Sequence, residues 1–308
     1  MNITITDMRP WVEKELVKID RNMNWGKYLN LMKRVVEARV YDPDYDELGR
    51  WKVILDKRVT RPAFKTAKSW EQLCNLYYAY VLGILPNCPT YGTLDVESSA
   101  LRDQLLSVTK QGVITLDSQP GICDEKERQR AYLRFIVNRK YINVHNLYKE
   151  LRSSRKILVE RFPRDGSAPR KIDPKYFTKE VEQIPFPDHL PPEQKRYLAP
   201  GDTFSSTPPD NESFLFSVQG DIVMPLTAEK TGNSVWRLHT LYAFLEKDKP
   251  EDHWDMIKEY LVNCDVKDED VVEFAIYHRK FCKTNLIDFL EQVLQNLHGP
   301  KFGIKFAQ

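Results

Sequence analysis

The fold class is decided by residues 131–161, which have the sequence AYLRFIVNRKYINVHNLYKELRSSRKILVER. Residues 131–138 and 156–161 are rich in β-branched and aromatic side chains, a composition typical of strands. Between these two segments, apolar residues recur at helical spacing, and Asn143 can cap the helix. This strand–helix–strand succession predicts an α/β protein and favours a parallel pair of strands.

The elements around this unit extend the same pattern. Residues 113–117 and 271–277 have the composition of two further strands, so we expect one mixed sheet of four strands. Helices that would cover this sheet are predicted at 69–85, 95–109, 143–153 and 284–298.

The chain is expected to form one domain in four parts. Residues 162–210 hold ten of the nineteen prolines, which predicts a long irregular segment. The other parts are an N-terminal helical extension at 1–60, the α/β core at 61–161, and a C-terminal part at 211–308 that completes the domain. In the C-terminal part we expect a hairpin at 214–225 and helices at about 234–246 and 251–263.

The composition excludes several classes of protein. A chain of 308 residues with 42% hydrophobic and 11% aromatic residues is not disordered. It has no apolar run of the roughly 18–20 residues that a membrane helix needs, and its N-terminus lacks an apolar signal-peptide core. The five cysteines include no CxxC pair, so we expect neither a disulfide framework nor a zinc site. These features predict a protein without a membrane partner, in a reducing compartment, the cytoplasm or nucleus.

Positive charge is concentrated in one part of the chain. Between Arg128 and Lys171 there are thirteen Lys or Arg and three acidic residues, although the whole chain has a net charge of only +2. This stretch is either a solvated face or a surface that binds a nucleic acid or an acidic protein. The interleaved aromatic residues Tyr132, Phe135, Tyr141 and Tyr148 could stack on bases or lie in the core. The candidate nucleic-acid-binding residues, all expected to be solvated, are Arg134, Arg139, Lys149, Arg152 and Arg155.

The turn-forming string Asp117-Ser-Gln-Pro-Gly121 follows a predicted buried strand. The carboxyl ends of strands in α/β sheets are where ligands bind. Gln119 offers two donors and one acceptor, which suits an amide or a base edge. The alternative is a structural turn whose polar side chains satisfy the nearby backbone.

An ordered series of motifs surrounds this turn. It consists of Trp70, Leu82-Gly83, Pro89-Thr-Tyr91-Gly92, Glu97, Gly112-Val-Ile-Thr115, Ser118-Gln-Pro-Gly121 and Gln129-Arg130-Ala131. In order and spacing, residues 69–160 resemble an uncharacterised domain family seen mostly in actinobacterial proteins, and such chains also resemble proteins of large DNA viruses. The resemblance to this family implies no particular activity.

The resemblance implies that several polar residues belong to one arrangement. Glu97 and Ser118 would be its catalytic residues, Glu97 as a general acid or base. Arg130 would clamp an anion, or it would simply pair with Glu97. The ligand-binding residues would be Gln119, Gly121, Gln129 and Arg130.

Two functions of different classes follow. The first is an α/β protein, either an enzyme or a binding protein, with a pocket for a nucleotide-like or glycosidic small molecule at the Ser-Gln-Pro-Gly turn. The second is a non-enzymatic interaction protein that binds nucleic acid or an acidic partner through the basic residues of 128–171. No cofactor or metal is expected, because the sequence lacks phosphate-loop, dinucleotide-binding and metal-binding motifs.

Overall fold

The computed structural model describes most of residues 56–163 and 253–298, with shorter pieces elsewhere. In full, the described residues are 10, 12–14, 24–37, 56–85, 87–90, 98, 100–163, 167, 170, 172, 179–180, 203–206, 214–218, 221–231, 235–239 and 253–298.

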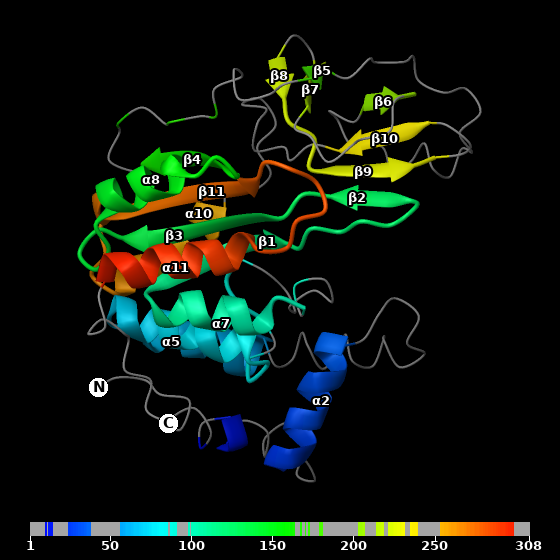
Figure 1. The fold of residues 1–308 in the computed structure, drawn as a ribbon. Coiled ribbons are helices and arrows are strands. Elements are labelled where there is room, and N and C mark those ends of the chain that lie inside the picture. Colours follow the sequence, from blue (N-terminus) through cyan, green and yellow to red (C-terminus); the bar gives the residue numbers. More distant parts are fainter. Residues whose placement is uncertain are drawn as a thin grey trace.

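The core of the fold is a four-stranded sheet with helices packed around it (Figure 1). Its strands, in spatial order, are β1 (Val113–Gln119), β3 (Tyr132–Asn138), β11 (Val271–His278) and β4 (Ile157–Pro163). The α/β class is confirmed, and the four predicted strands share one sheet. The predicted pair β3 and β4 runs parallel, but the two strands are not neighbours, because β11 lies between them and is antiparallel to both.

Helices α8 (Val144–Ser153) and α11 (Leu286–His298) lie in front of this sheet in Figure 1, with α7 (Arg102–Lys110) and α5 (Trp70–Val81) below them beside β1. Side chains cap two of these helices, and one of these side chains is the predicted cap Asn143. The Ser69 hydroxyl accepts a hydrogen bond from the Gln72 N–H, and the Asn143 side chain accepts one from the Asn146 N–H. The Trp70 indole donates to the Gly112 carbonyl at 3.0 Å and ties α5 to the start of β1.

The remaining described elements are further helices and two small sheets. The helical ones are α2 (Trp25–Glu37), the π-helix η1 (Asp56–Thr60), α4 (Arg61–Thr66), α10 (His253–Asn263) and the 3₁₀-helix η4 (Asp268–Asp270). One small sheet has the order β2 (Glu127–Gln129), β9 (Thr227–Lys230), β10 (Trp236–His239), β6 (Thr203–Ser205). The other has the order β5 (Lys179–Glu180), β7 (Phe214–Val218), β8 (Asp221–Val223).

The small sheets test two predictions from the sequence. The hairpin predicted at 214–225 is confirmed by the antiparallel pair β7–β8. The helix predicted at 234–246 is wrong over 236–239, because β10 pairs there with β9 and β6. Most of the proline-rich part at 162–210 and most of the N-terminal extension lie outside the described residues.

Apolar side chains bury both faces of the four-stranded sheet. The main core fills the space between sheet and helices, and includes Leu133, Phe135 and Phe274, the last two stacked with ring centroids 5.4 Å apart. A smaller cluster lies on the opposite face and brings in residues from the segment between β8 and β9. Its buried members are Tyr132, Leu158, Met224, Leu226, Ala275 and Tyr277. Among the described residues, no helix is long and apolar enough to cross a bilayer.

Candidate functional site

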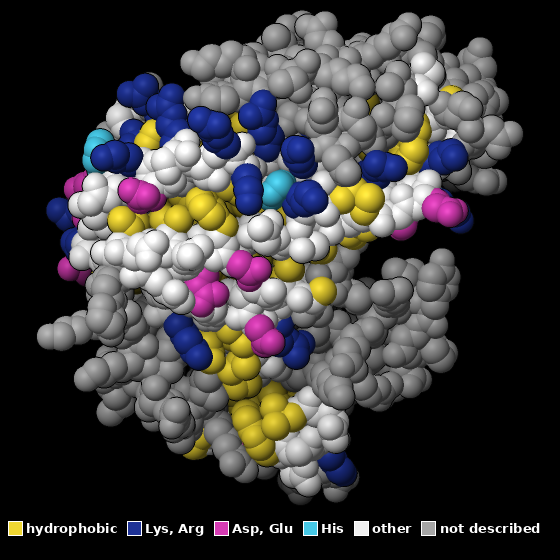
Figure 2. Space-filling model, viewed as in Figure 1, with side chains coloured by type: hydrophobic (Ala, Val, Ile, Leu, Met, Phe, Trp, Pro, Cys, Tyr) yellow, Lys and Arg dark blue, Asp and Glu magenta, His cyan; other side chains and the backbone are white. Residues whose placement is uncertain are grey.

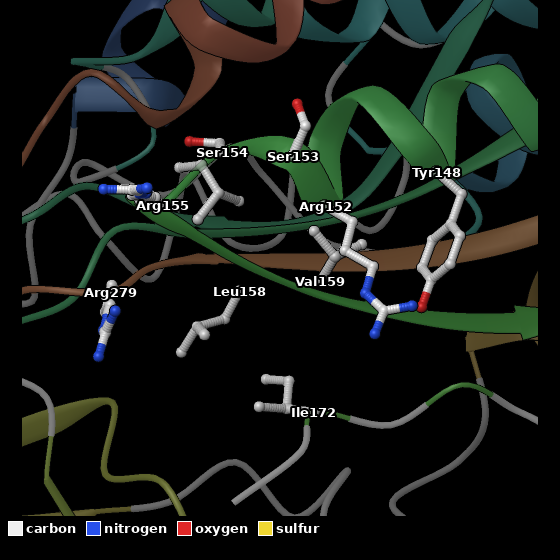
Figure 3. A pocket seen from close by; sticks show the side chains of 10 residues that line it. Tyr148, Arg152, Ser153, Ser154, Arg155, Leu158, Val159, Ile172 and Arg279 are labelled. Carbon is white, nitrogen blue, oxygen red and sulfur yellow. The ribbon is translucent and has the colours of Figure 1, made fainter. Parts of the chain in front are cut away.

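A cavity of about 160 Å³ lies beside the edge strand β4, where α8 ends (Figure 3). We call it the arginine cavity, because Arg152, Arg155 and Arg279 line it. Its other lining residues are Tyr148, Ser153, Ser154, Ile157, Leu158, Val159 and Ile172. No acidic side chain is among the described residues that line it. Three arginines and no acidic residue of the described chain therefore line one hollow.

The short connection between α8 and β4 positions two of these arginines. The helix ends at Ser153, and the Ser154 N–H donates to the Leu151 carbonyl at 3.3 Å. The Ser154 hydroxyl in turn accepts from the Lys156 N–H at 3.2 Å, which fixes the turn into the strand. Arg152 leaves the last turn of the helix and stacks over the Tyr148 ring, 6.0 Å from its centroid. Arg155 follows in the turn itself.

The third arginine comes from a distant part of the sequence. The Arg279 N–H donates to the Lys156 carbonyl at 2.7 Å, so the chain leaving β11 runs beside the start of β4. The Arg279 carbonyl accepts a hydrogen bond from the Arg130 guanidinium, which holds this loop from the other side. Sequence reasoning missed Arg279, because no local pattern shows that β11 is inserted next to β4.

The arginine cavity lies on a larger positively charged surface (Figure 2). We call it the basic face and define it by the exposed residues Arg139, Lys149, Arg152, Arg155 and Lys156 together with Arg279. Lys and Arg side chains gather there over α8 and β4 in Figure 2. Four of the five predicted basic residues are thus exposed.

Arg134 is the exception, and the prediction that it is solvated is wrong. It lies on β3 with its side chain only 14% exposed, and both Nε and Nη2 donate to Oε1 of the buried Glu273 on β11. Next to this pair, the Tyr277 hydroxyl donates to Glu160 Oε2 at 3.1 Å. Burial, and after it the Glu160 charge, raises the pKa of Tyr277 well above its usual value. None of these four side chains lines the arginine cavity, so we assign them a structural role.

The Ser-Gln-Pro-Gly string begins inside a strand, not in a turn. Ser118 and Gln119 belong to β1 and pair with Leu133 and Tyr132 of β3. The Ser118 hydroxyl lies 3.2 Å from that of Ser98. Gln119 Oε1 is buried and has no hydrogen-bond partner among the described residues. Glu97, the proposed acid or base, lies outside the described residues, so its part in this arrangement stays a prediction.

The rest of the predicted ligand-binding set makes contacts within the protein. The Gln129 amide donates to the Pro120 carbonyl at 2.8 Å. Arg130 is fully buried, donates from Nε to the Pro225 carbonyl at 2.9 Å, and lies over the Phe281 ring at 4.1 Å. Gly121 packs against the backbone of Lys283. These contacts support the structural interpretation of the turn for Gly121, Gln129 and Arg130.

A disulfide joins the loop after β1 to the loop after β11. Cys123 and Cys282 are joined, with Cα atoms 4.9 Å apart and a sequence separation of 159. The Cys282 N–H also donates to the Gln129 carbonyl at 3.1 Å. The cysteine spacing predicted no disulfide framework, and one disulfide is nevertheless present. The spacing of cysteines along the chain could not reveal the pair, because the sheet topology brings its members together.

No group of His, Cys, Asp or Glu residues in the described parts of the chain could hold a metal ion. The arginine cavity instead has the chemistry of an anion site, with guanidinium groups, two serines and an edge-strand backbone.

Residues 59–172 match the model of a domain family described as a domain of unknown function, DUF6919. The match covers β1, β3, α8 and β4, and with them the Ser-Gln-Pro-Gly string and two of the three cavity arginines. The matched residues include the whole of residues 69–160, the region whose motifs resemble an uncharacterised family. No curated protein matches the sequence at a significant level.

Proposed function

We propose that the protein is a non-enzymatic interaction protein that binds an acidic protein partner on its basic face, with the arginine cavity at the centre of the contact. The observation that carries this proposal is that the fold brings Arg152, Arg155 and Arg279, from three separate places in the structure, into the lining of one cavity. Planar guanidinium groups bind carboxylates through paired hydrogen bonds, and arginine is enriched at protein interfaces. A merely solvated surface needs no such convergence.

The aromatic residues favour an acidic protein over a single-stranded nucleic acid. Stacking on bases requires aromatic faces that are open to the ligand. Tyr132 and Phe135 are buried in the two cores. Tyr141 is half-buried, and Tyr148 lies between the guanidinium groups of Arg152 and Arg161, at 6.0 and 5.2 Å from its ring centroid. The stacking platforms that the sequence suggested therefore serve mostly as packing.

The proposal is tested with poly-L-glutamate, single-stranded DNA and duplex DNA, each titrated into the full-length chain at several salt concentrations. We expect poly-L-glutamate to bind and its affinity to fall as salt rises, because the contact is largely between charges. The double variant Arg152→Ala/Arg155→Ala should lose about tenfold or more in affinity. Lys57→Ala/Arg58→Ala removes the same charge from exposed positions on η1 and should bind as the wild type does.

Three results would overturn the proposal. One is that poly-L-glutamate does not bind. Another is that both double variants lose affinity equally, which would indicate a general charge effect. The third is that DNA binds more tightly than poly-L-glutamate and loses affinity in the Arg152→Ala/Arg155→Ala variant, which would establish the nucleic-acid alternative instead.

A small-molecule site at the Ser-Gln-Pro-Gly string is the second candidate, favoured by one observation. Gln119 Oε1 is a buried acceptor with no partner among the described residues, and such an atom costs free energy unless a ligand or water satisfies it. A panel of nucleotides and sugars tests this candidate by thermal shift. A ligand that raises the Tm of the wild type and not that of Gln119→Ala supports it. If no member of the panel shifts the Tm, this candidate is rejected.

A further inference from the structure

The outer edge of β4 has backbone groups that face the arginine cavity. Along an antiparallel strand, alternate residues direct their N–H and C=O groups to the same side. Arg161 exchanges both of its backbone hydrogen bonds with Arg170 on the outer side, at 2.9 and 2.8 Å. Val159 and Ile157, two and four residues earlier, therefore direct their N–H and C=O groups outward as well. Within the described part of the chain, no strand pairs with them on that side.

Ile172, the next described residue after Arg170, does not continue this pairing. The Ile172 N–H donates to the side chain of Glu160, at 3.5 Å, instead of to a backbone carbonyl of β4. The Ile172 side chain packs in the cluster that contains Leu158, on the face of the sheet opposite the helices. The pairing that begins at Arg161 thus stops before it reaches the cavity.

The two sides of this strand edge differ in chemistry (Figure 3). On the α8 side stand Arg152 and Tyr148, and on the other side Leu158 and Ile172. Arg155 and Arg279 both lie near the end where β4 begins. A strand laid along this edge would meet charge on one face and apolar side chains on the other. A peptide that alternates acidic and apolar residues has this pattern, because successive side chains of a strand point to opposite faces.

We infer that an extended acidic peptide adds to β4 as an extra strand, so that the backbone groups of Ile157 and Val159 bond to it. Its acidic side chains lie against Arg152 and its apolar side chains against Leu158 and Ile172. Arg155 and Arg279 bind a carboxylate at one end. Adding a strand to an exposed sheet edge is a general way to bind extended peptides, with affinity from main-chain bonds and specificity from alternate side chains. This inference rests on the proposed function and specifies how the acidic partner binds.

Hydrogen exchange of the free full-length chain gives the first test. The Ile157 and Val159 amides should exchange quickly, because they face solvent, while the alternate amides of Leu158 and Glu160, which face β11, should exchange slowly. If the Ile157 and Val159 amides are already protected, the edge is occupied and the inference is overturned. On binding the synthetic peptide Ac-(Val-Glu)4-NH2, both amides should become protected. Binding without this protection would also overturn the inference.

A pair of matched peptides tests the main-chain bonds directly. One carries N-methyl groups on all valines and the other on all glutamates. In an added strand, only one of these sets directs its N–H groups toward β4, so one peptide should lose about tenfold or more in affinity while the other still binds. Equal binding of both peptides would exclude strand addition.

The outcomes separate this inference from the proposed function. If both methylated peptides bind as the unmodified one does, and Arg152→Ala/Arg155→Ala abolishes that binding, the acidic-partner function stands and strand addition fails. If neither Ac-(Val-Glu)4-NH2 nor poly-L-glutamate binds, the proposed function itself fails. Ile157→Pro removes one outward N–H at the first residue of a strand, where proline is tolerated, and should weaken the unmodified peptide severalfold.

Discussion

Gly121 and the backbone of Lys283 are in such close contact that a Cβ atom on Gly121 would lie 2.1 Å from the Lys283 carbonyl oxygen. The glycine of the Ser-Gln-Pro-Gly string is therefore explained by the approach of another loop, which leaves no room for a side chain. The same approach brings Cys123 within bonding distance of Cys282.

Gly121→Ala should destabilise the protein, because the two backbones must move apart to admit a methyl group. We expect a loss of about 1–3 kcal/mol in the free energy of unfolding, measured by urea denaturation. Gly26→Ala is the control, since its Cβ would meet only Asn24 Oδ1, at the ordinary contact distance of 3.5 Å. That change lies in α2 and should be neutral or slightly stabilising. Equal effects of the two changes would contradict this account of the loop contact.

Arg134→Met should cost far more than the loss of a surface charge, because it leaves the carboxylate of Glu273 buried without its ion-pair partner. Removal of one member of a buried pair costs about 3–5 kcal/mol. The double variant Arg134→Met/Glu273→Leu should recover most of that loss. Lys65→Met breaks the exposed pair with Glu259 and should cost at most about 1 kcal/mol. A similar small cost for Arg134→Met would show that the pair is not structural.

Reduction of the Cys123–Cys282 disulfide should lower the Tm, since the bond closes a loop of 159 residues. Removing a native disulfide costs about 2–5 kcal/mol. Alkylation followed by mass spectrometry should label no cysteine rapidly in the oxidised protein, because Cys74, Cys88 and Cys264 are buried. Burial also raises the pKa of Cys264 to about 11, which keeps its thiol unreactive. Mild reduction should add two labels, and labels at Cys123 and Cys282 before reduction would disprove the bond.

His278 should make the protein less stable in mild acid. Burial lowers the pKa of His278, and the positive charges of Lys283 and Arg130 act in the same direction, although a backbone hydrogen bond with Lys280 opposes them. Because the unfolded chain then binds the proton more tightly, the contribution of neutral His278 is complete above about pH 6.5. It is lost progressively as the pH falls below that value toward the lower folded-state pKa.

The measurement is the free energy of unfolding at pH 7.5 and pH 5.5 for the wild type, His278→Asn and His145→Asn. His278→Asn should reduce the loss of stability between the two pH values. His145 is exposed on α8, so its replacement should leave that loss unchanged. An unchanged loss in His278→Asn would mean that this imidazole does not titrate as the structure indicates.

From the sequence, the strands of the main sheet and the helices beside it were easier to predict than which strands pair with each other. Alternating and helical patterns depend on whether a side chain faces the core, and this is a local property. The pairing of β11 with both β3 and β4 is a long-range property that no local pattern records. The parallel pair was predicted from the β3–α8–β4 crossover alone, which leaves room for a strand between its members.

Two local errors have physical reasons that the sequence contains. In β10, Trp236 and Leu238 are buried while Arg237 and His239 are partly exposed, and this period of two indicates a strand. The longer apolar sequence that follows favoured a helix. Arg134 was counted with its basic neighbours, yet it lies at the centre of a strand flanked by apolar residues, where a charge needs a partner across the sheet. For the candidate site, Arg152 and Arg155 were predictable from local charge, whereas Arg279 and the disulfide depend on topology.

The central position of β11 has a consequence for how the molecule is made. During synthesis, β3 and β4 leave the ribosome more than a hundred residues before the strand that joins them. Until then, each presents an unpaired edge, and the nascent chain exposes apolar surface that invites aggregation or chaperone binding. Contacts between residues so distant in sequence also slow folding. A fragment that ends at residue 172 would contain the matched family region and still lack the strand that unites its sheet.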